Sequence, residues 1–75
     1  MYEKFANLLV EELQIYKKDI TLDAELSNDL GINSIELADL VMLCEEKFGI
    51  TIDDEEIRKF TTVGDVVAYL ETLDL

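Results

Sequence analysis

The groups most able to take part in chemistry are the hydroxyl of Ser34 and the carboxylates that follow it in the sequence. Ser34 comes just after Gly31 and Asn33 and directly before an amphipathic, acidic helical pattern. Serine or asparagine at a helix start usually caps it, by accepting hydrogen bonds from amides that the first turn leaves unpaired. The same amides and the positive end of the helix dipole also suit a phosphate on the serine oxygen. Ser34 is therefore either a cap or the anchor of a phosphodiester.

The scarcity of histidine and cysteine excludes several kinds of chemistry. The chain contains no histidine and one cysteine, Cys44. A Ser-His-Asp or Cys-His nucleophile is therefore excluded, as is a zinc site built from cysteine and histidine. A single cysteine cannot form a disulfide within the chain, which favours a reducing cytoplasm over secretion. Cys44 falls on the apolar stripe of a predicted helix, where we expect a buried structural thiol.

The charge of the chain is strongly acidic, with 18 acidic and 6 basic residues and a formal net charge of −12. This composition argues against nucleic-acid binding, which requires lysine and arginine to neutralise phosphates. It suits brief contacts with basic patches on other proteins. The chain lacks the patterns of a signal peptide, a transit peptide or a membrane span. We expect one compact, monomeric domain over residues 1–75, with 49% hydrophobic residues for its core.

Four helices are predicted around that core. An apolar stripe at steps of three and four indicates a first helix over about residues 2–17. A second begins near Ser34 and stops at Gly49, a short third begins with the acidic run 53–56 as its cap and first turn, and a fourth begins with the Thr62–Asp65 capping pattern. The stripe residues are Tyr2, Phe5, Leu8, Leu9, Leu13 and Tyr16, then Leu37, Leu40, Val41, Cys44 and Phe48, then Ile57 and Phe60, then Val63, Val66, Val67, Leu70 and Leu73.

The segment from Lys18 to Asn33 lacks helical periodicity and is predicted to be a long loop, which in a compact domain is often functional. Its apolar residues Ile20, Leu22 and Leu26, together with Leu30, are expected to anchor it to the core. The sequence contains no proline and no period-two alternation, so strands are not indicated. The predicted fold is all-α, a small four-helix bundle of three longer helices and one short one.

The segment Asp29-Leu30-Gly31-Ile32-Asn33-Ser34-Ile35-Glu36-Leu37 resembles the attachment motif of acyl carrier proteins, Asp-Leu-Gly-x-Asp-Ser-Leu. The runs from Glu45 to Ile50, from Ile52 to Glu56 and from Thr61 to Asp65 follow the family pattern in order and spacing. The resemblance therefore covers nearly the whole chain. It implies that Ser34 receives 4'-phosphopantetheine from coenzyme A through a separate, magnesium-dependent phosphopantetheinyl transferase. It also implies that the chain is a carrier rather than an enzyme, with acyl groups held as thioesters on the arm.

The resemblance extends to other positions, one at a time. Glu36, Asp39, Glu45 and Glu46 match acidic positions through which family members meet basic patches on acyl-transferring and condensing enzymes. Asp54, Glu55 and Glu56 match the acidic start of the third helix, where capping explains them equally well. Met42, Ile52, Ile57 and Phe60 lie where the family closes a pocket for the acyl chain, and they would also be apolar as ordinary core residues.

Three positions depart from the family pattern. Asn33 replaces the usual Asp before the serine, which keeps the capping ability and removes one charge at the contact with the transferase. Ile35 replaces Leu, and Asp53 stands where many members have Pro. None of these changes removes the acceptor hydroxyl. They leave open which transferase modifies the chain and which pathway it serves.

The segments after Ser34 most resemble those of discrete, bacterial-type fatty-acid carriers, which implies a role in fatty-acid biosynthesis. Other kinds of function remain open. Within the same class, the chain could carry polyketide, aminoacyl or other specialised acyl units. In a different class, it could be an unmodified acidic adapter in which Ser34 only caps a helix. A calcium-binding EF-hand does not fit, because placing each glycine at the invariant loop position puts Leu26, Cys44 or Lys59 at the first ligand position.

Overall fold

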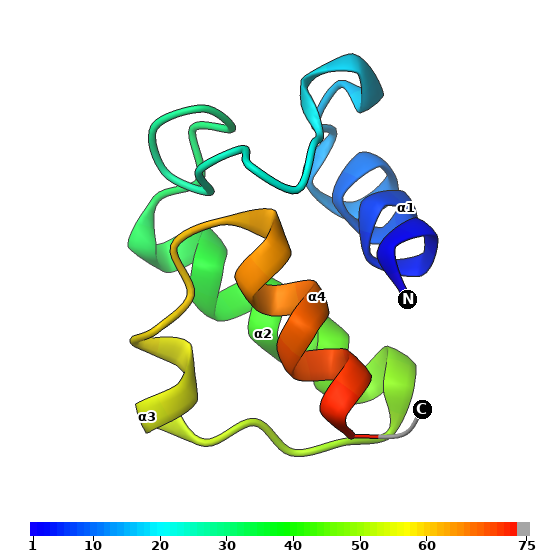
Figure 1. Ribbon diagram of the computed structural model, residues 1–75, viewed down its shortest axis with the longest axis vertical. Coiled ribbons are helices and arrows are strands. Elements are labelled where there is room, and N and C mark those ends of the chain that lie inside the picture. The colour runs from blue at the N-terminus through cyan, green and yellow to red at the C-terminus, as the bar shows by residue number, and fades with distance from the viewer. Residues whose placement is uncertain (74–75) are drawn as a thin grey trace.

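The computed structural model describes residues 1–73 and is all-α, as predicted (Figure 1). Three longer helices, α1, α2 and α4, form the bundle. The short α3 lies at its edge, on the side away from α1. Among the described residues, none of the helices is both long and apolar enough to cross a membrane. The elements are α1 (Tyr2–Leu13), a 3-10 turn (Lys17–Asp19), α2 (Ser34–Phe48), α3 (Asp54–Ile57) and α4 (Val63–Thr72).

Helix α1 ends earlier than predicted. Gln14 adopts a left-handed conformation with φ 58°, and its N–H donates to the carbonyl of Leu9. The N–H of Ile15 donates to the same carbonyl over 3.2 Å, so the helix closes before the stripe reaches Tyr16. The prediction of a helix to residue 17 with Tyr16 on its apolar face is therefore wrong, and 71% of Tyr16 is exposed.

The long loop between α1 and α2 is confirmed, and it is attached to the start of α4. The N–H of Leu26 donates to the carbonyl of Thr61 over 2.9 Å, and that of Val63 donates to Ala24 over 3.0 Å. A third bond, 2.9 Å long, runs from the N–H of Gly64 to the carbonyl of Leu22. These bonds surround an isolated antiparallel bridge between Glu25 and Thr62, which is the sole strand-like pairing of the described chain.

Three of the four predicted loop anchors are buried: Ile20, Leu26 and Leu30. The fourth, Leu22, is 53% exposed, so its prediction as an anchor is wrong. The physical reason is that Leu22 is held by its backbone carbonyl. A Cβ added to Gly64 would lie 3.0 Å from that oxygen, which is closer than most Cβ contacts, so the close approach of the two backbones favours glycine.

Helices α2 and α4 begin and end with strong local signals. Gly49 ends α2 in the left-handed conformation expected of it, with φ 66°. Thr62 and Asp65 form the predicted capping box at the start of α4. Hydrogen bonds from the backbone N–H groups of Thr62 and Thr61 hold the pKa of Asp65 below its usual value.

The core is apolar throughout: among the described residues, no polar or charged side chain is fully buried. The carboxylates that give the chain its charge therefore lie on or near the surface. The buried residues are Phe5, Ala6, Leu8, Leu9, Ile20, Ala24, Leu26, Leu30, Ile32, Leu40, Val41, Cys44, Ile52, Val63, Val66, Val67 and Leu70. Leu13, Leu37, Phe48, Ile57, Phe60 and Leu73 pack against this core and are half-buried.

Candidate functional site

The start of α2 is capped by Asn33 and not by Ser34. The Asn33 Oδ1 accepts a hydrogen bond from the N–H of Glu36 over 2.8 Å. In return, Glu36 Oε1 accepts from the N–H of Asn33 over 3.2 Å. This is a complete capping box, which satisfies two amides of the helix start. Ser34 is the first residue of the helix, and its exposed hydroxyl is not needed as a cap.

The position of Ser34 is fixed by the end of the long loop. Ile32 is buried, and its N–H donates to the carbonyl of Leu26 over 2.9 Å. Gly31, with φ 68°, turns the chain just before it. The hydroxyl of Ser34 therefore stands on a defined helix start rather than on a loose loop. In the described structure, the N–H groups of Ser34 and Ile35 have no hydrogen-bond partner, and α2 is long enough for its dipole to favour an anion there.

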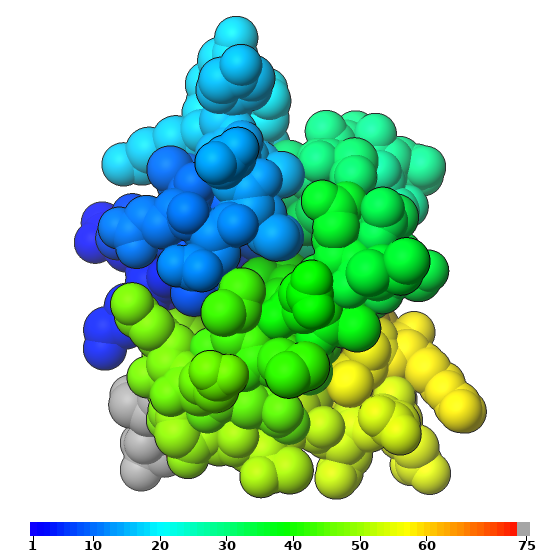
Figure 2. Space-filling model, turned by 180° about the vertical axis from the view of Figure 1, so that it is seen from behind, coloured from blue at the N-terminus to red at the C-terminus, as the bar shows by residue number. Residues whose placement is uncertain are grey.

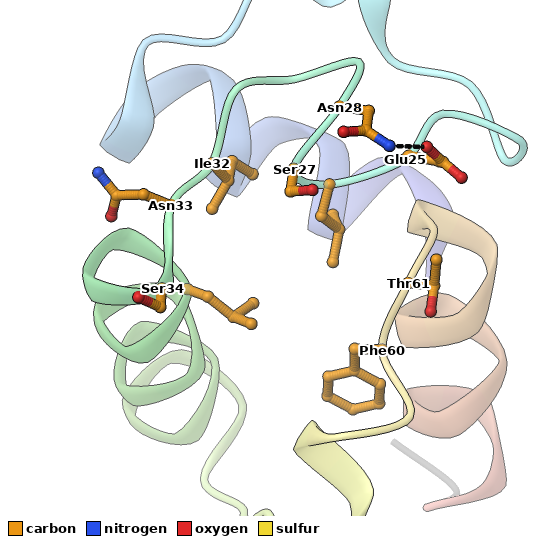
Figure 3. A pocket seen from close by; sticks show the side chains of 10 residues that line it. Glu25, Ser27, Asn28, Ile32, Asn33, Ser34, Phe60 and Thr61 are labelled. Carbon is orange, nitrogen blue, oxygen red and sulfur yellow. Dashed lines mark hydrogen bonds between the residues drawn. The ribbon is translucent and has the colours of Figure 1, made fainter.

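Ser34 lies at the meeting point of two hollows. The first, the loop-side pocket, has a volume of about 320 Å³ and lies between the long loop, α2 and the segment before α4 (Figure 3). The second, the α2–α3 groove, has a volume of about 480 Å³. Ser34 and Leu37 line both of them. A group attached to Ser34 Oγ therefore has access to either hollow.

The two hollows separate the residues that were predicted to form an acyl pocket. Met42, Ile52 and Ile57 come together in the α2–α3 groove. Ile52 is buried, while Met42 is 57% exposed. Phe60 does not join them. It lines the loop-side pocket, where Figure 3 shows its ring beside Thr61, and its ring centroid lies 5.7 Å from that of Tyr69.

Several residues that line the groove were not predicted. Leu37, Ala38 and Val41 follow Ser34 by three, four and seven positions, which places them on the same side of α2. Counting helical spacing from Ser34 would have found all of them. Asp54 also lines the groove, although the sequence predicted it only as a contact for partners.

The acidic residues predicted to meet partners on α2 fall into two kinds. Asp39 and Glu46 are exposed. Glu36 and Glu45 are half-buried and already hydrogen-bonded, Glu36 in the capping box and Glu45 to the N–H of Ile52 over 2.7 Å. Their carboxylates also stabilise the local backbone.

The surface of α2 is shown from behind in Figure 2, where its side chains (green) lie across this face of the molecule with α3 (yellow) beside them. Ile35, the residue next to Ser34, is 75% exposed. The sequence marked it only as a departure from the family pattern and not as an exposed apolar side chain. On α3, Asp54 and Glu55 are exposed. Glu56 is half-buried and forms an ion pair of 3.5 Å with Lys59.

Cys44 is buried, as predicted, with 1% of its surface exposed. Burial raises the pKa of its thiol to about 12, and the neighbouring Glu45 carboxylate adds to the shift. At neutral pH the side chain is therefore a protonated thiol within the core.

Comparisons with known proteins agree on one family. A family model described as "Phosphopantetheine attachment site" matches residues 3–70. An acyl carrier protein of Helicobacter acinonychis is 42% identical over 71 residues, which span 95% of this chain and 91% of that protein. One of Thermotoga maritima is 39% identical over 95% of this chain and 88% of its own. A Mycobacterium tuberculosis protein, solved as a candidate acyl carrier protein, superposes with a TM-score of 0.88 at 28% identity over 96% of both chains.

The capping box predicts different costs for neighbouring substitutions. Asn33→Ala removes the acceptor for the Glu36 N–H, and we expect it to lower the free energy of unfolding by about 1 kcal/mol. Ser34→Ala removes no cap and should change it by less than about 0.5 kcal/mol. Asn33→Asp keeps an acceptor and serves as the matched control. Urea denaturation followed by circular dichroism measures all three, and a larger cost for Ser34→Ala than for Asn33→Ala would contradict the assignment.

The buried thiol predicts slow alkylation of the native chain. At pH 8, iodoacetamide should label Cys44 at least about a hundredfold more slowly in the folded protein than in denaturant, because both burial and the raised pKa reduce the accessible thiolate. Ala68→Cys, at an exposed position of α4, provides a control thiol that should react rapidly in the folded protein. Intact mass follows both labels. Equal labelling of Cys44 in the folded and unfolded chains would refute this prediction.

Proposed function

The chain belongs to the acyl carrier protein family, and on this basis we propose that Ser34 carries its 4'-phosphopantetheine arm. Members of the family hold this prosthetic group covalently and act as carriers, not as enzymes. When attached, the arm supplies a terminal thiol on which acyl groups are held as thioesters. The observation that carries the proposal is the capping box: Asn33 satisfies the helix start, and so the Ser34 hydroxyl is left exposed and available.

The residues around Ser34 fit a phosphodiester at that oxygen. The unpaired N–H groups of Ser34 and Ile35 and the positive end of the α2 dipole favour the negative charge of a phosphate. The chain contains no histidine to act as a base. Ser34 is thus the acceptor in a transfer from coenzyme A, and a separate phosphopantetheinyl transferase supplies the base and the magnesium ion.

The α2–α3 groove is the proposed place for the acyl chain. It begins at Ser34 and is lined by Leu37, Val41 and Ile52 on its apolar side. Because Ser34 itself lines the groove, an acyl group on an arm anchored there lies close to its entrance. Met42 at the rim and Ile57 from α3 complete it, whereas Phe60 contributes to the loop-side pocket.

The proposed contact surface for partner enzymes combines charge with exposed apolar side chains. Asp39 and Glu46 present exposed carboxylates on α2, and Ile35 and Met42 are exposed on the same helix. Such a surface suits basic patches with apolar residues between them, which charge steers into contact. Glu36, Glu45, Asp54, Glu55 and Glu56 add to its negative potential, and Asn33, the N-cap of α2, is an uncharged member of the same surface.

We place the carrier in fatty-acid biosynthesis, in the cytoplasm and as a monomer of one domain over residues 1–75. The support for this pathway is the pattern of the segments after Ser34, which resembles that of discrete fatty-acid carriers. A carrier dedicated to polyketide, aminoacyl or other specialised units is the alternative within the family. Identification of the acyl group bound to the chain after purification from its native cell separates the two.

Loading at Ser34 is tested by intact mass after incubation with coenzyme A and a broad-specificity phosphopantetheinyl transferase. The wild-type chain should gain one phosphopantetheine, and Ser34→Ala should gain none. Ser27→Ala removes the only other serine of the chain and should load normally. A wild-type chain that stays unmodified while a control carrier is loaded would support the unmodified adapter instead, in which Ser34 has no chemical role.

The contact surface predicts a salt-dependent rate of loading. In Asp39→Asn/Glu46→Gln, kcat/KM of the transferase should fall about three- to tenfold at low salt, because steered association weakens. The difference should shrink in 0.5 M salt, where the Debye length is only a few ångström. Glu3→Gln/Glu11→Gln removes two exposed charges from α1 and is the matched control. An equal loss in the control would show that net charge alone matters.

A further inference from the structure

The loop-side pocket and the α2–α3 groove meet at Ser34, but they differ in the polar groups that they offer. Besides Ser34, the polar side chains that line the groove are the carboxylates of Glu45 and Asp54. An ionised carboxylate only accepts hydrogen bonds. The loop-side pocket is lined also by neutral polar side chains, among them the hydroxyl of Thr61 and the amide of Asn28. It can therefore both donate to and accept from a neutral ligand.

Part of this hydrogen-bonding capacity is unused within the described chain. Asn28 donates its side-chain amide to Glu25 Oε1, the bond drawn in Figure 3, and its own Oδ1 accepts no hydrogen bond from residues 1–73. The Thr61 hydroxyl also has no partner in the described part of the chain, although the backbone N–H and carbonyl of Thr61 are both bonded. Both residues are exposed. A donor and two acceptors are therefore available to a ligand in the pocket.

Apolar side chains complete the wall of the loop-side pocket. Leu26 is buried, while Leu37 and Phe60 are half-buried. Figure 3 shows Phe60 and Thr61 across the pocket from Ser34. The loop and the segment before α4 are tied together here, because the N–H of Leu26 donates to the carbonyl of Thr61 over 2.9 Å. The pocket is thus preformed, and its volume of about 320 Å³ is near the lower end for ligand sites.

The chemistry of a pantetheine arm matches this mixed lining. Such an arm contains amides, each with an N–H and a carbonyl, separated by short apolar segments. Its amides need donors and acceptors, which Thr61 and Asn28 provide, and its carbon segments need apolar contacts, which Leu26 and Phe60 provide. In the groove, by contrast, no lining side chain could donate to the carbonyls of the arm once Ser34 is esterified.

We propose that the loop-side pocket is a resting site for the pantetheine arm when the arm carries no acyl group. Thr61 and Asn28 bond its amides, and Phe60 packs against its branched carbon segment. A long acyl chain favours the groove instead, because its apolar surface is buried there. The arm and the cargo therefore use different hollows beside Ser34. This inference rests on the proposed attachment of the arm at Ser34.

The pocket is tested first with free pantetheine, added to the unmodified chain under reducing conditions and followed by NMR. A short attached arm has an effective concentration of about millimolar, so free pantetheine at about 20 mM is a sufficient probe. The amide signals of Asn28 and Thr61 should shift with a dissociation constant of about a few millimolar. Those of Val41 and Ile57, in the groove, should shift little. No shift at Asn28 and Thr61, or larger shifts at Val41 and Ile57, would overturn the proposal.

The polar contacts are tested by two variants at exposed positions. Thr61→Val keeps the branched shape and removes the hydroxyl, and Asn28→Ala removes the amide. Each should weaken the binding of free pantetheine about three- to tenfold, because one neutral hydrogen bond is lost. Thr51→Val is the matched control, since Thr51 is exposed and lines neither hollow, and it should bind pantetheine as wild type does. Unchanged binding in both Thr61→Val and Asn28→Ala would overturn the proposed site.

The attached arm is then examined in the loaded chain, again by NMR. Its methyl protons should show nuclear Overhauser contacts with the ring of Phe60, and these contacts should weaken in Thr61→Val. Contacts with Val41 or Ile57 in place of Phe60 would overturn the proposal. The measurement with free pantetheine uses the unmodified chain and does not depend on loading. A chain that binds free pantetheine but fails to load at Ser34 therefore overturns the proposed function and not the pocket.

Discussion

Three backbone hydrogen bonds between the long loop and the start of α4 hold the site together. They join Leu26 to Thr61, Val63 to Ala24 and Gly64 to Leu22. The carbonyl of Leu26 in turn accepts a hydrogen bond from the N–H of Ile32, which lies two residues before Ser34. The position of the acceptor hydroxyl thus depends on contacts made far along the chain. Without them the loop would lose its fixed path, and the loop-side pocket would lose its shape.

The net negative charge of the chain opposes folding. A formal net charge of −12 on 75 residues works against compaction, because like charges repel. The core of the described residues consists of apolar side chains alone and buries no charged group, so burial adds no cost for the charges. Some carboxylates also reduce the cost by accepting backbone hydrogen bonds, as Glu36, Glu45 and Asp65 do. Part of the acidic surface therefore also stabilises the local backbone, while exposed carboxylates such as those of Asp39 and Glu46 are accessible to partners.

Features that depend on local signals could be predicted from the sequence. Gly49 ends α2 and Thr62 caps α4 as expected, because glycine and threonine act on their immediate neighbours. The end of α1 at Gln14 could not be predicted, since glutamine rarely adopts φ 58°. The choice of Asn33 over Ser34 as cap was also undecided, because both side chains can accept the bond. The separation of Phe60 from Met42 depends on how α3 leads into α4, which no short motif records.

Leu37 lines both hollows beside Ser34. A shorter side chain at this position would enlarge the two spaces together, and a longer one would narrow both. Natural selection therefore cannot reshape one hollow through Leu37 without altering the other. Independent adaptation has to use residues that belong to a single hollow, such as Phe60 on one side and Met42 on the other.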